Sequence, residues 1–315
     1  MDPGHWLTDR TYRGADYDPA ELAAIAAARG TRITVCLPML DVADTVGPIV
    51  EGVRRELMER VPLVSELMVV DTGSEDASCA RAAEAGARVW RAGEILPTLP
   101  PQRGKGDALW KSLAVAEGEL IVWLDSDVTD PDPAFVPGLL GPLLADPEVD
   151  YVKAVYTRAL GDDPEGGGRV TEICARPLLN MFYPELTGLA QPLSGEAAGR
   201  REVLMGIPFF SGYAVETGLL IDLLGARGLG ALAQVDLGAR RHTNQATTTL
   251  GAMASSIAQA VLLRVAEEGR APADLAGDGR YVRPVRVGGE WVMHDIETRP
   301  AQRPAMRGVL AAVGA

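Results

Sequence analysis

The sequence predicts an α/β fold, in which a mostly parallel sheet carries helices on both faces. Short β-rich runs alternate with stretches of helical spacing between residues 31 and 124, and this alternation is typical of parallel strands joined by right-handed crossovers. Three of the apolar runs end in polar residues, as strands do at the ligand-binding edge of an open sheet. A chain of 315 residues that is 47% hydrophobic and 23% charged can bury a large core, as one big domain or one and a half.

The first half of the chain supplies most of the predicted sheet. We expect residues 1–30 to form a loose lead-in that ends in an Ala-rich helix near 20–29. The run 33–37 predicts a strand ended by Pro38, and the apolar spacing within 45–60 predicts a helix with Asp44 or Thr45 as its N-cap. The elements expected next are a strand at 67–70, a helix at 77–85, a strand at 87–90, a helix at 105–117 and a strand at 120–124.

The rhythm changes after residue 150, where loops become longer and richer in glycine. The elements expected there are a strand at 151–156, helices at 169–181 and 214–225, a strand at 232–237 and a long helix at 247–268. We therefore divide the chain into a lead-in (1–30), a first half (31–150), a second half (151–268) and a tail of uncertain structure (269–315).

Composition excludes several classes of protein. The net charge of −13 argues against a nucleic-acid partner, although local arginines and lysines with a metal can still hold an anionic substrate. Three widely separated cysteines form neither a disulfide framework nor a zinc motif, which favours a reducing cytoplasm. No uninterrupted apolar run approaches a membrane span, and the first residues lack the pattern of a secretory signal.

Two aspartates carry the strongest chemical signal. Asp125 and Asp127 follow the apolar run 121–124, so a strand would present both carboxylates at its carboxyl end. Hard oxygen donors suit Mg²⁺ or Mn²⁺, which in turn bind a diphosphate. The alternative is that Asp-Ser-Asp simply forms a turn.

Other polar residues fall at the same predicted edge. Residues 38–41 end one strand, and Asp71 with Thr72 ends the next, where Asp71 either accepts a base or ribose hydroxyl or caps an Asx-turn. Lys105 stands between two glycines at a helix start and either reaches a phosphate or lies in a surface turn. The spacing of a nucleotide-hydrolase phosphate loop is absent.

Three further sites belong to the second half. His242 is either a third metal ligand or a structural histidine. Arg169 opens a helix beside Thr171, which makes either an anion site or a solvated helix end. Glu216 lies in an apolar setting and needs a partner, either a pair of sugar hydroxyls or a buried arginine.

Together these residues resemble one family. The matching runs are Val64-Ser65-Glu66-Leu67, Arg103-Gly104-Lys105-Gly106 with Ala108-Leu109-Trp110, Asp125-Ser126-Asp127, Gly166-Gly167-Gly168-Arg169-Val170-Thr171-Glu172, Ala175-Arg176-Pro177-Leu178-Leu179, Gln191-Pro192-Leu193-Ser194-Gly195-Glu196, Gly218-Leu219-Leu220-Ile221-Asp222 and Ala233-Gln234-Val235-Asp236-Leu237-Gly238. Over residues 31–265 the chain strongly resembles the glucosyl-3-phosphoglycerate synthases, which are retaining glycosyltransferases of the GT-A fold with a Rossmann-like sheet. Mannosyl-3-phosphoglycerate synthases are close relatives.

The resemblance implies a donor site in the first half and an acceptor-binding and catalytic part in the second. The implied reaction moves glucose from a nucleotide-diphosphate glucose, expected to be UDP-glucose, to the 2-hydroxyl of 3-phosphoglycerate, in a cytoplasmic homodimer. The implied nucleotide-sugar residues are Pro38, Met39, Leu40, Asp71, Thr72, Lys105, Asp125, Ser126 and Asp127. Asp127, Asp125 and His242 would hold the metal, Glu216 the sugar hydroxyls, and the Leu193 carbonyl would lie near the anomeric carbon. The implied acceptor residues are Gly168, Arg169, Thr171, Arg240 and Asn244.

The chain departs from the family pattern in two places. Val42 stands where the family has a glutamate that helps to hold the base or ribose, and the loop before Gly166 is short. These departures leave open a different base or sugar, such as GDP-mannose or GDP-glucose, or a different acceptor. A nucleotide-sugar-binding protein without catalysis and a nucleotidyltransferase are the alternatives of another class.

Overall fold

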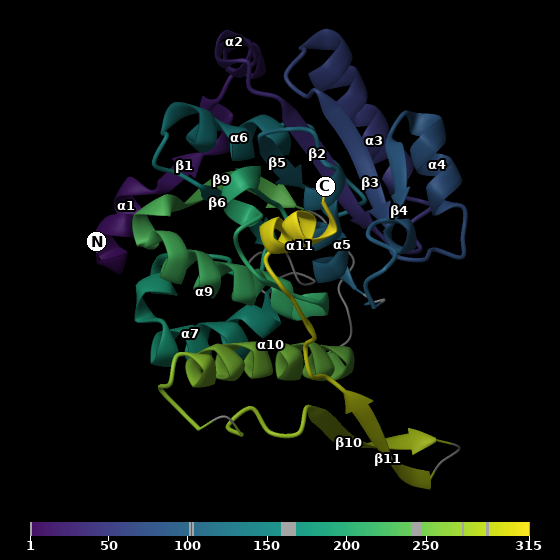
Figure 1. Cartoon of the computed structure of the whole chain (residues 1–315), viewed down its shortest axis with the longest axis vertical. Helices are drawn as coiled ribbons and strands as arrows, with labels where there is room; N and C mark the ends of the chain where they lie inside the picture. Colours follow the sequence, from purple (N-terminus) through teal and green to yellow (C-terminus); the bar gives the residue numbers. More distant parts are fainter. Residues whose placement is uncertain are drawn as a thin grey trace.

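Helices lie on both faces of a central sheet, and a hairpin projects from one end of the molecule (Figure 1). The computed structural model describes residues 2–100, 102, 104–158, 168–240, 247–272, 274–287 and 290–314.

Within these residues the central sheet has eight strands in the order β1-β9-β6-β7-β5-β2-β3-β4. They are β1 (Thr11–Arg13), β2 (Ile33–Met39), β3 (Glu66–Asp71), β4 (Arg88–Arg91), β5 (Leu120–Trp123), β6 (Tyr151–Arg158), β7 (Ala197–Arg200) and β9 (Leu232–Arg240). Strand β7 runs antiparallel to β5 and β6, and the other described neighbours are parallel. The mostly parallel sheet predicted from the sequence is therefore confirmed.

The α-helices are α1 (Pro3–Asp9), α2 (Pro19–Arg29), α3 (Val46–Arg54), α4 (Ser78–Ala85), α5 (Lys105–Val115), α6 (Phe135–Ala145), α7 (Arg176–Phe182), α8 (Arg201–Leu204), α9 (Val215–Arg227), α10 (Thr247–Glu267) and α11 (Met306–Val313). Two π-helical segments, Arg55–Arg60 and Thr171–Ala175, continue α3 and precede α7. Short 3₁₀ turns lie at Gly14–Asp16, Ala92–Glu94, Pro184–Gly188, Gly212–Ala214 and Leu229–Ala231.

The core has two layers, one on each face of the sheet. Ile33, Val35 and Leu37 of β2 pack beneath α2, α3, α4 and α6, whereas Cys36 packs on the opposite side with α5, α9 and α10. Every residue of β2 and β3 is buried, which explains why these strands read as nearly continuous apolar runs.

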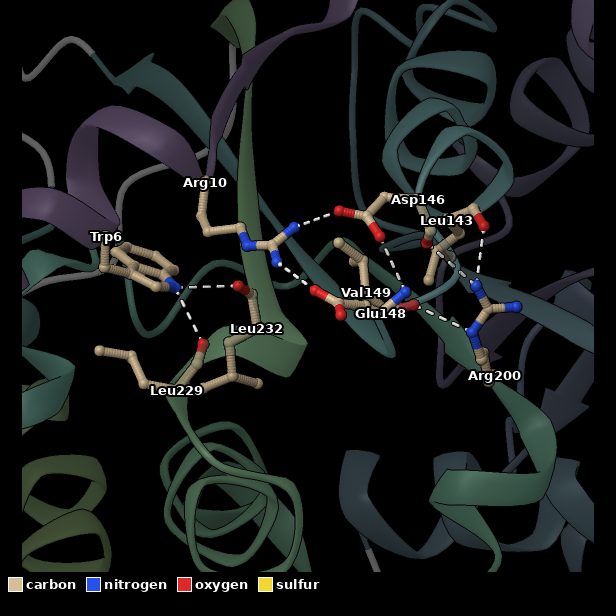
Figure 2. A network of polar contacts seen from close by, with 9 residues as sticks. All are labelled: Trp6, Arg10, Leu143, Asp146, Glu148, Val149, Arg200, Leu229 and Leu232. Atoms are coloured by element: carbon tan, nitrogen blue, oxygen red, sulfur yellow. Dashed lines mark hydrogen bonds and ion pairs between the residues drawn. The ribbon is translucent and has the colours of Figure 1, made fainter. Parts of the chain in front are cut away.

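The N-terminal residues form part of the fold and are not the loose lead-in predicted from the sequence. Trp6 of α1 is fully buried, and its indole N–H donates to the carbonyls of Leu229 and Leu232 (Figure 2). Arg10 pairs with Asp146 at the C-terminal end of α6, and β1 joins β9 in parallel. The lead-in lacks an obvious pattern because these contacts join residues more than a hundred positions apart.

The C-terminal segment returns to the central core. Strands β10 (Arg280–Val287) and β11 (Glu290–Glu297) form the projecting hairpin, and the chain then passes α10 towards α11 (Figure 1). Strand β12 (Gln302–Arg303) pairs with β8 (Phe209–Phe210). Arg303 donates to Asp107 of α5 at 2.7 Å, and Trp110 donates to the Pro304 carbonyl at 2.8 Å. The tail thereby ties the helix that starts at Lys105.

Of two local predictions around the first strand, the strand end is wrong and the N-cap position is confirmed. Pro38 does not end β2, because Met39 still pairs with β3. The N–H that proline lacks would point towards β5, and the pairing of β2 with β5 has already ended at Cys36. Thr45 does occupy the N-cap position of α3, as predicted, but its side chain makes no capping bond, because its hydroxyl donates to the Ser126 carbonyl at 2.6 Å. The remaining predicted elements are present with small changes of length. The division at residues 30, 150 and 268 stays a prediction, and the central sheet takes strands from both sides of residues 30 and 150.

Candidate active site

A cavity of about 490 Å³ lies where β2, β3 and β5 end. Parallel strands bring their carboxyl ends to one edge, so residues far apart in the sequence meet there. The predicted site residues that line it are Pro38, Met39, Leu40, Thr72, Lys105, Asp125, Ser126, Asp127, Gly168, Arg169, Thr171, Leu193 and Glu216. The cavity thus unites the donor and acceptor residues expected from the sequence.

The Asp125–Asp127 segment is fixed by its neighbours. The hydroxyl of Ser126 donates to the Pro38 carbonyl at 2.6 Å, and its own carbonyl accepts from Thr45. Asp125 packs against the bare Cα of Gly195, where an added Cβ would lie 2.0 Å from Asp125 Oδ2. Both aspartates line the cavity, which favours ligand binding over the alternative of a simple turn.

Lys105 lies at the start of α5 and faces two carboxylates. Its ammonium is 2.7 Å from Asp125 Oδ1 and 3.0 Å from Glu216 Oε1, and it also donates to the Gly195 carbonyl at 3.1 Å. Burial alone would lower the pKa of Lys105, but Asp125 and Glu216 outweigh it and raise the pKa above its ordinary value. The ammonium therefore stays charged, as a phosphate-binding lysine must.

Glu216 lies in the first turn of α9 and is held between two lysines. Its Oε2 accepts from Lys153 of β6 at 2.6 Å, while its Oε1 lies near Lys105. In the described part of the chain, Oε1 is buried and makes no hydrogen bond in good geometry, and its nearest cation is the Lys105 ammonium at 3.0 Å. The buried arginine considered from the sequence is not the partner of Glu216.

Sequence reasoning missed Lys153. Its side chain is 1% exposed, and its ammonium also donates to the Ser194 carbonyl. Burial lowers the pKa of Lys153, and the charge of Glu216 opposes that shift. A charged residue within the apolar run 151–156 was the one available signal, because a strand buried on both faces keeps a lysine only with a partner.

The donor set fits Mg²⁺ or Mn²⁺. Asp125 and Asp127 bring carboxylate oxygens to one cavity, and Gly195 leaves the space that Asp125 fills. Mg²⁺ in proteins is commonly bound by one or two carboxylates, substrate phosphates and water. Among the described residues no three His, Cys, Asp or Glu side chains form a ready-made metal cluster. The predicted ligand His242 lies outside those residues.

The acceptor residues form another part of the cavity lining. Gly168 has a φ of 75°, which suits glycine, and Arg169 follows it. Thr171 begins the π-helical segment and is buried at the cavity wall. Leu250, Met253 and Ile257 of α10 supply an apolar lining beside them.

Four predicted residues are not placed in the cavity. Asp71 does not line it, and its carboxylate accepts the N–H groups of Gly73 and Ser74, which is the Asx-turn alternative. Arg240 ends β9, and its side chain lies outside the description. Asn244, like His242, lies outside the described residues.

Comparison with known proteins identifies the class. Residues 34–205 match the model of glycosyl transferase family 2. A glucosyl-3-phosphoglycerate synthase of Mycolicibacterium smegmatis is 47% identical over 266 residues, which cover 83% of this chain and 86% of the relative.

Solved structures agree with this assignment. The mannosyl-3-phosphoglycerate synthase of Rubrobacter xylanophilus has a TM-score of 0.91 at 40% identity, with 98% of this chain and 99% of that one covered. The glucosyl-3-phosphoglycerate synthase of Mycobacterium tuberculosis, solved with Mn²⁺, UDP-glucose and phosphoglyceric acid, has a TM-score of 0.81 at 39% identity, with 93% and 95% covered. The chain belongs to glycosyl transferase family 2, and within it to the family of the glucosyl-3-phosphoglycerate synthases, so the predicted GT-A fold is confirmed.

Proposed function

We propose that this protein transfers glucose from UDP-glucose to the 2-hydroxyl of 3-phosphoglycerate, with retention and with Mg²⁺ or Mn²⁺. One observation carries the proposal: a single cavity holds the Asp125–Asp127 pair, Lys105 and Glu216 together with Arg169 and Thr171. The bound ligands of the Mycobacterium tuberculosis enzyme support the choice of donor and acceptor.

The donor is held by the edge formed from β2 and β5. Met39, Leu40 and Thr72 would contact the nucleoside, and Asp125 with Asp127 would hold the metal and the diphosphate. When bound, the cation neutralises charge that builds on the departing diphosphate. Lys105 supports the same oxygens with its fixed charge. His242 completes the proposed ligand set.

The sugar lies between Glu216 and the Leu193–Gly195 loop. The Glu216 carboxylate would accept a hydroxyl of glucose, and the Leu193 carbonyl would face the positive charge that develops at the anomeric carbon. No base of the chain is required, because an oxygen of the leaving diphosphate can take the acceptor proton on the same face. Holding two anionic substrates in register supplies much of the rate.

The acceptor is held by the wall that contains Gly168, Arg169 and Thr171. A guanidinium and a hydroxyl at a helix start suit a phosphate or carboxylate. Asn244 and Arg240 complete the proposed acceptor site.

A second candidate donor is GDP-mannose. Val42, an apolar residue, lines the cavity near Pro38 and Leu40, and its N–H donates to the Ser78 hydroxyl at 2.7 Å. A valine cannot accept a hydrogen bond from a base or ribose, so the base is selected by other groups. The similarity to a mannosyl-3-phosphoglycerate synthase favours testing this donor.

We also propose a cytoplasmic homodimer that does not span a membrane. The segment Leu250–Glu267 of α10 is long and apolar enough to cross one. However, its Arg264 is buried in an ion pair with Asp222 of α9, and its Ile257 lines the cavity. The hairpin exposes Val282 and Met293, apolar residues that a second copy of the chain could cover.

The test is turnover. The protein is incubated with Mg²⁺, 3-phosphoglycerate and UDP-, GDP- or ADP-sugars, and nucleotide release is measured with and without acceptor. We expect acceptor-dependent UDP release from UDP-glucose. Absence of turnover with every donor would contradict the proposal. Turnover only with an unphosphorylated acceptor would show that the acceptor is not 3-phosphoglycerate.

A further inference from the structure

Lys153 and Lys105 together join Glu216 to the loop that lines the opposite side of the sugar site. Lys153 contacts Glu216 Oε2 and the Ser194 carbonyl, and Lys105 contacts Glu216 Oε1 and the Gly195 carbonyl. Two ammonium groups therefore bridge two consecutive carbonyls to the two oxygens of one carboxylate. This arrangement fixes the distance between α9 and the Leu193–Gly195 loop.

The two lysines differ in what else they can do. Lys105 lines the cavity and is partly exposed, so it can meet substrate. Lys153 projects from β6 on the same face as Tyr151, is 1% exposed and does not line the cavity. Its ammonium contacts Glu216 and Ser194, and Lys153 can act on a substrate only through these two groups.

We propose that Lys153 is a positioning residue for the transfer, which fixes Glu216 Oε2 and the Ser194 carbonyl so that the Glu216 carboxylate and the Leu193 carbonyl keep their places beside the donor sugar. The inference rests on the proposed function, because it assumes that Glu216 grips the sugar. It adds a residue whose contribution should appear with the sugar and not with the nucleotide.

The arrangement has a clear consequence for loss of the ammonium. In Lys153→Met the Ser194 carbonyl and Glu216 Oε2 lose a buried charged donor, and Glu216 keeps only Lys105. The Glu216 carboxylate would then be held at Oε1 alone and would shift relative to the cavity. A displacement of about 1 Å at a reacting group can cost about 10²-fold in rate.

The experiment compares kcat with ligand affinity. Lys153→Met should lower kcat by about 10²-fold, while the Kd for UDP with Mn²⁺ stays unchanged, and UDP-glucose should lose any advantage in affinity over UDP. The double variant Lys153→Met/Glu216→Gln should lose less than the product of the two single losses, because Lys153 acts in part through Glu216. A wild-type kcat in Lys153→Met, or multiplied losses in the double variant, would overturn the proposal.

A matched control separates positioning from folding. Lys111 is also a buried lysine, with its ammonium 2.6 Å from the Ala92 carbonyl and 3.4 Å from Asp107, away from Glu216. Lys111→Met should lose thermal stability and keep kcat. If Lys153→Met does not fold, Lys153→Gln, which retains a hydrogen-bond donor, should show the same split with a smaller loss.

The failure of this inference is distinguishable from failure of the proposed function. Unmodified protein that does not transfer glucose to 3-phosphoglycerate contradicts the function, and the affinities for UDP-glucose and UDP still decide the role of Lys153. If the unmodified protein transfers glucose, and Lys153→Met has the same kcat and the same affinity for UDP as the unmodified protein, only the role of Lys153 is contradicted.

Discussion

Replacing Gly195 with alanine should disable the donor side of the cavity through Asp125. A Cβ at position 195 would stand 2.0 Å from Asp125 Oδ2 and 2.3 Å from its Cγ, far inside van der Waals contact. Since the carbonyls of Ser194 and Gly195 are each held by a lysine, the loop has little freedom to retreat. The side chain of Asp125 must therefore move, and its 2.7 Å contact with Lys105 is lost.

The size of the effect follows from that contact. A hydrogen bond to a charged group contributes about 1.5–3 kcal/mol, and every 1.4 kcal/mol or so is a factor of ten in affinity. If the displaced carboxylate no longer serves the metal and diphosphate, UDP with Mn²⁺ should bind about 10- to 100-fold more weakly. Titration calorimetry with UDP, in the presence and absence of Mn²⁺, measures this directly.

Two further variants complete the test. Gly225 lies exposed in α9, and a Cβ there would meet nothing within 4 Å, so Gly225→Ala should leave binding unchanged. In Asp125→Ala/Gly195→Ala the clash is absent, so the double variant should be no less stable than Asp125→Ala alone, while nucleotide binding stays weak. Gly195→Ala protein that binds UDP and Mn²⁺ as tightly as the unmodified chain would refute the reasoning.

Three other outcomes are expected. Asp127→Ala should abolish the gain in UDP affinity that Mn²⁺ provides, measured by calorimetry; an unchanged gain would remove Asp127 from the metal site. Arg169→Ala should weaken the binding of 3-phosphoglycerate by about 2–4 kcal/mol, which is within the range for truncating one partner of a charge pair, and should leave UDP binding intact. Steady-state kinetics with the reverse pattern would mean that the donor and acceptor sites are assigned the wrong way round. The Glu148 N–H and Arg10 lower the pKa of Asp146 below 3.8, so its stabilisation, about 1 kcal/mol or less, exists above that pH and disappears as pH falls through the lowered pKa. Urea unfolding of Asp146→Asn should accordingly differ from the unmodified chain at pH 7 and match it in strong acid.

The convergence of the site was predictable because parallel sheets make it a matter of geometry. Once 33–37, 67–70 and 120–124 are read as parallel strands, their following residues must share an edge. Leu40, Thr72 and Asp125 do meet there. Asp71 shows the limit of this argument, because strand geometry does not say whether a carboxylate turns to a ligand or to the next two N–H groups of its own loop.

The elements that sequence reasoning missed depend on distant partners. Strand β7 has the sequence Ala-Ala-Gly-Arg, which carries little strand propensity, and it forms because β5 and β6 leave a gap between them. The C-terminal strand likewise exists through pairing with β8 and through the bond from Arg303 to Asp107, 196 residues away. Local patterns contain no trace of such pairings.

Net charge is a poor guide to what this cavity binds. The chain carries −13 overall, yet its site contains Lys105 and Arg169, with Lys153 directly behind Glu216. Carboxylates pair with the lysines and offset the cost of burying them, so cationic groups are present where phosphates would bind. The same carboxylates make the site sensitive to single neutral substitutions, since removal of one charge leaves its partner buried and unpaired. Because Lys153 does not line the cavity, Lys153→Met tests this dependence between paired charges without removing a substrate contact.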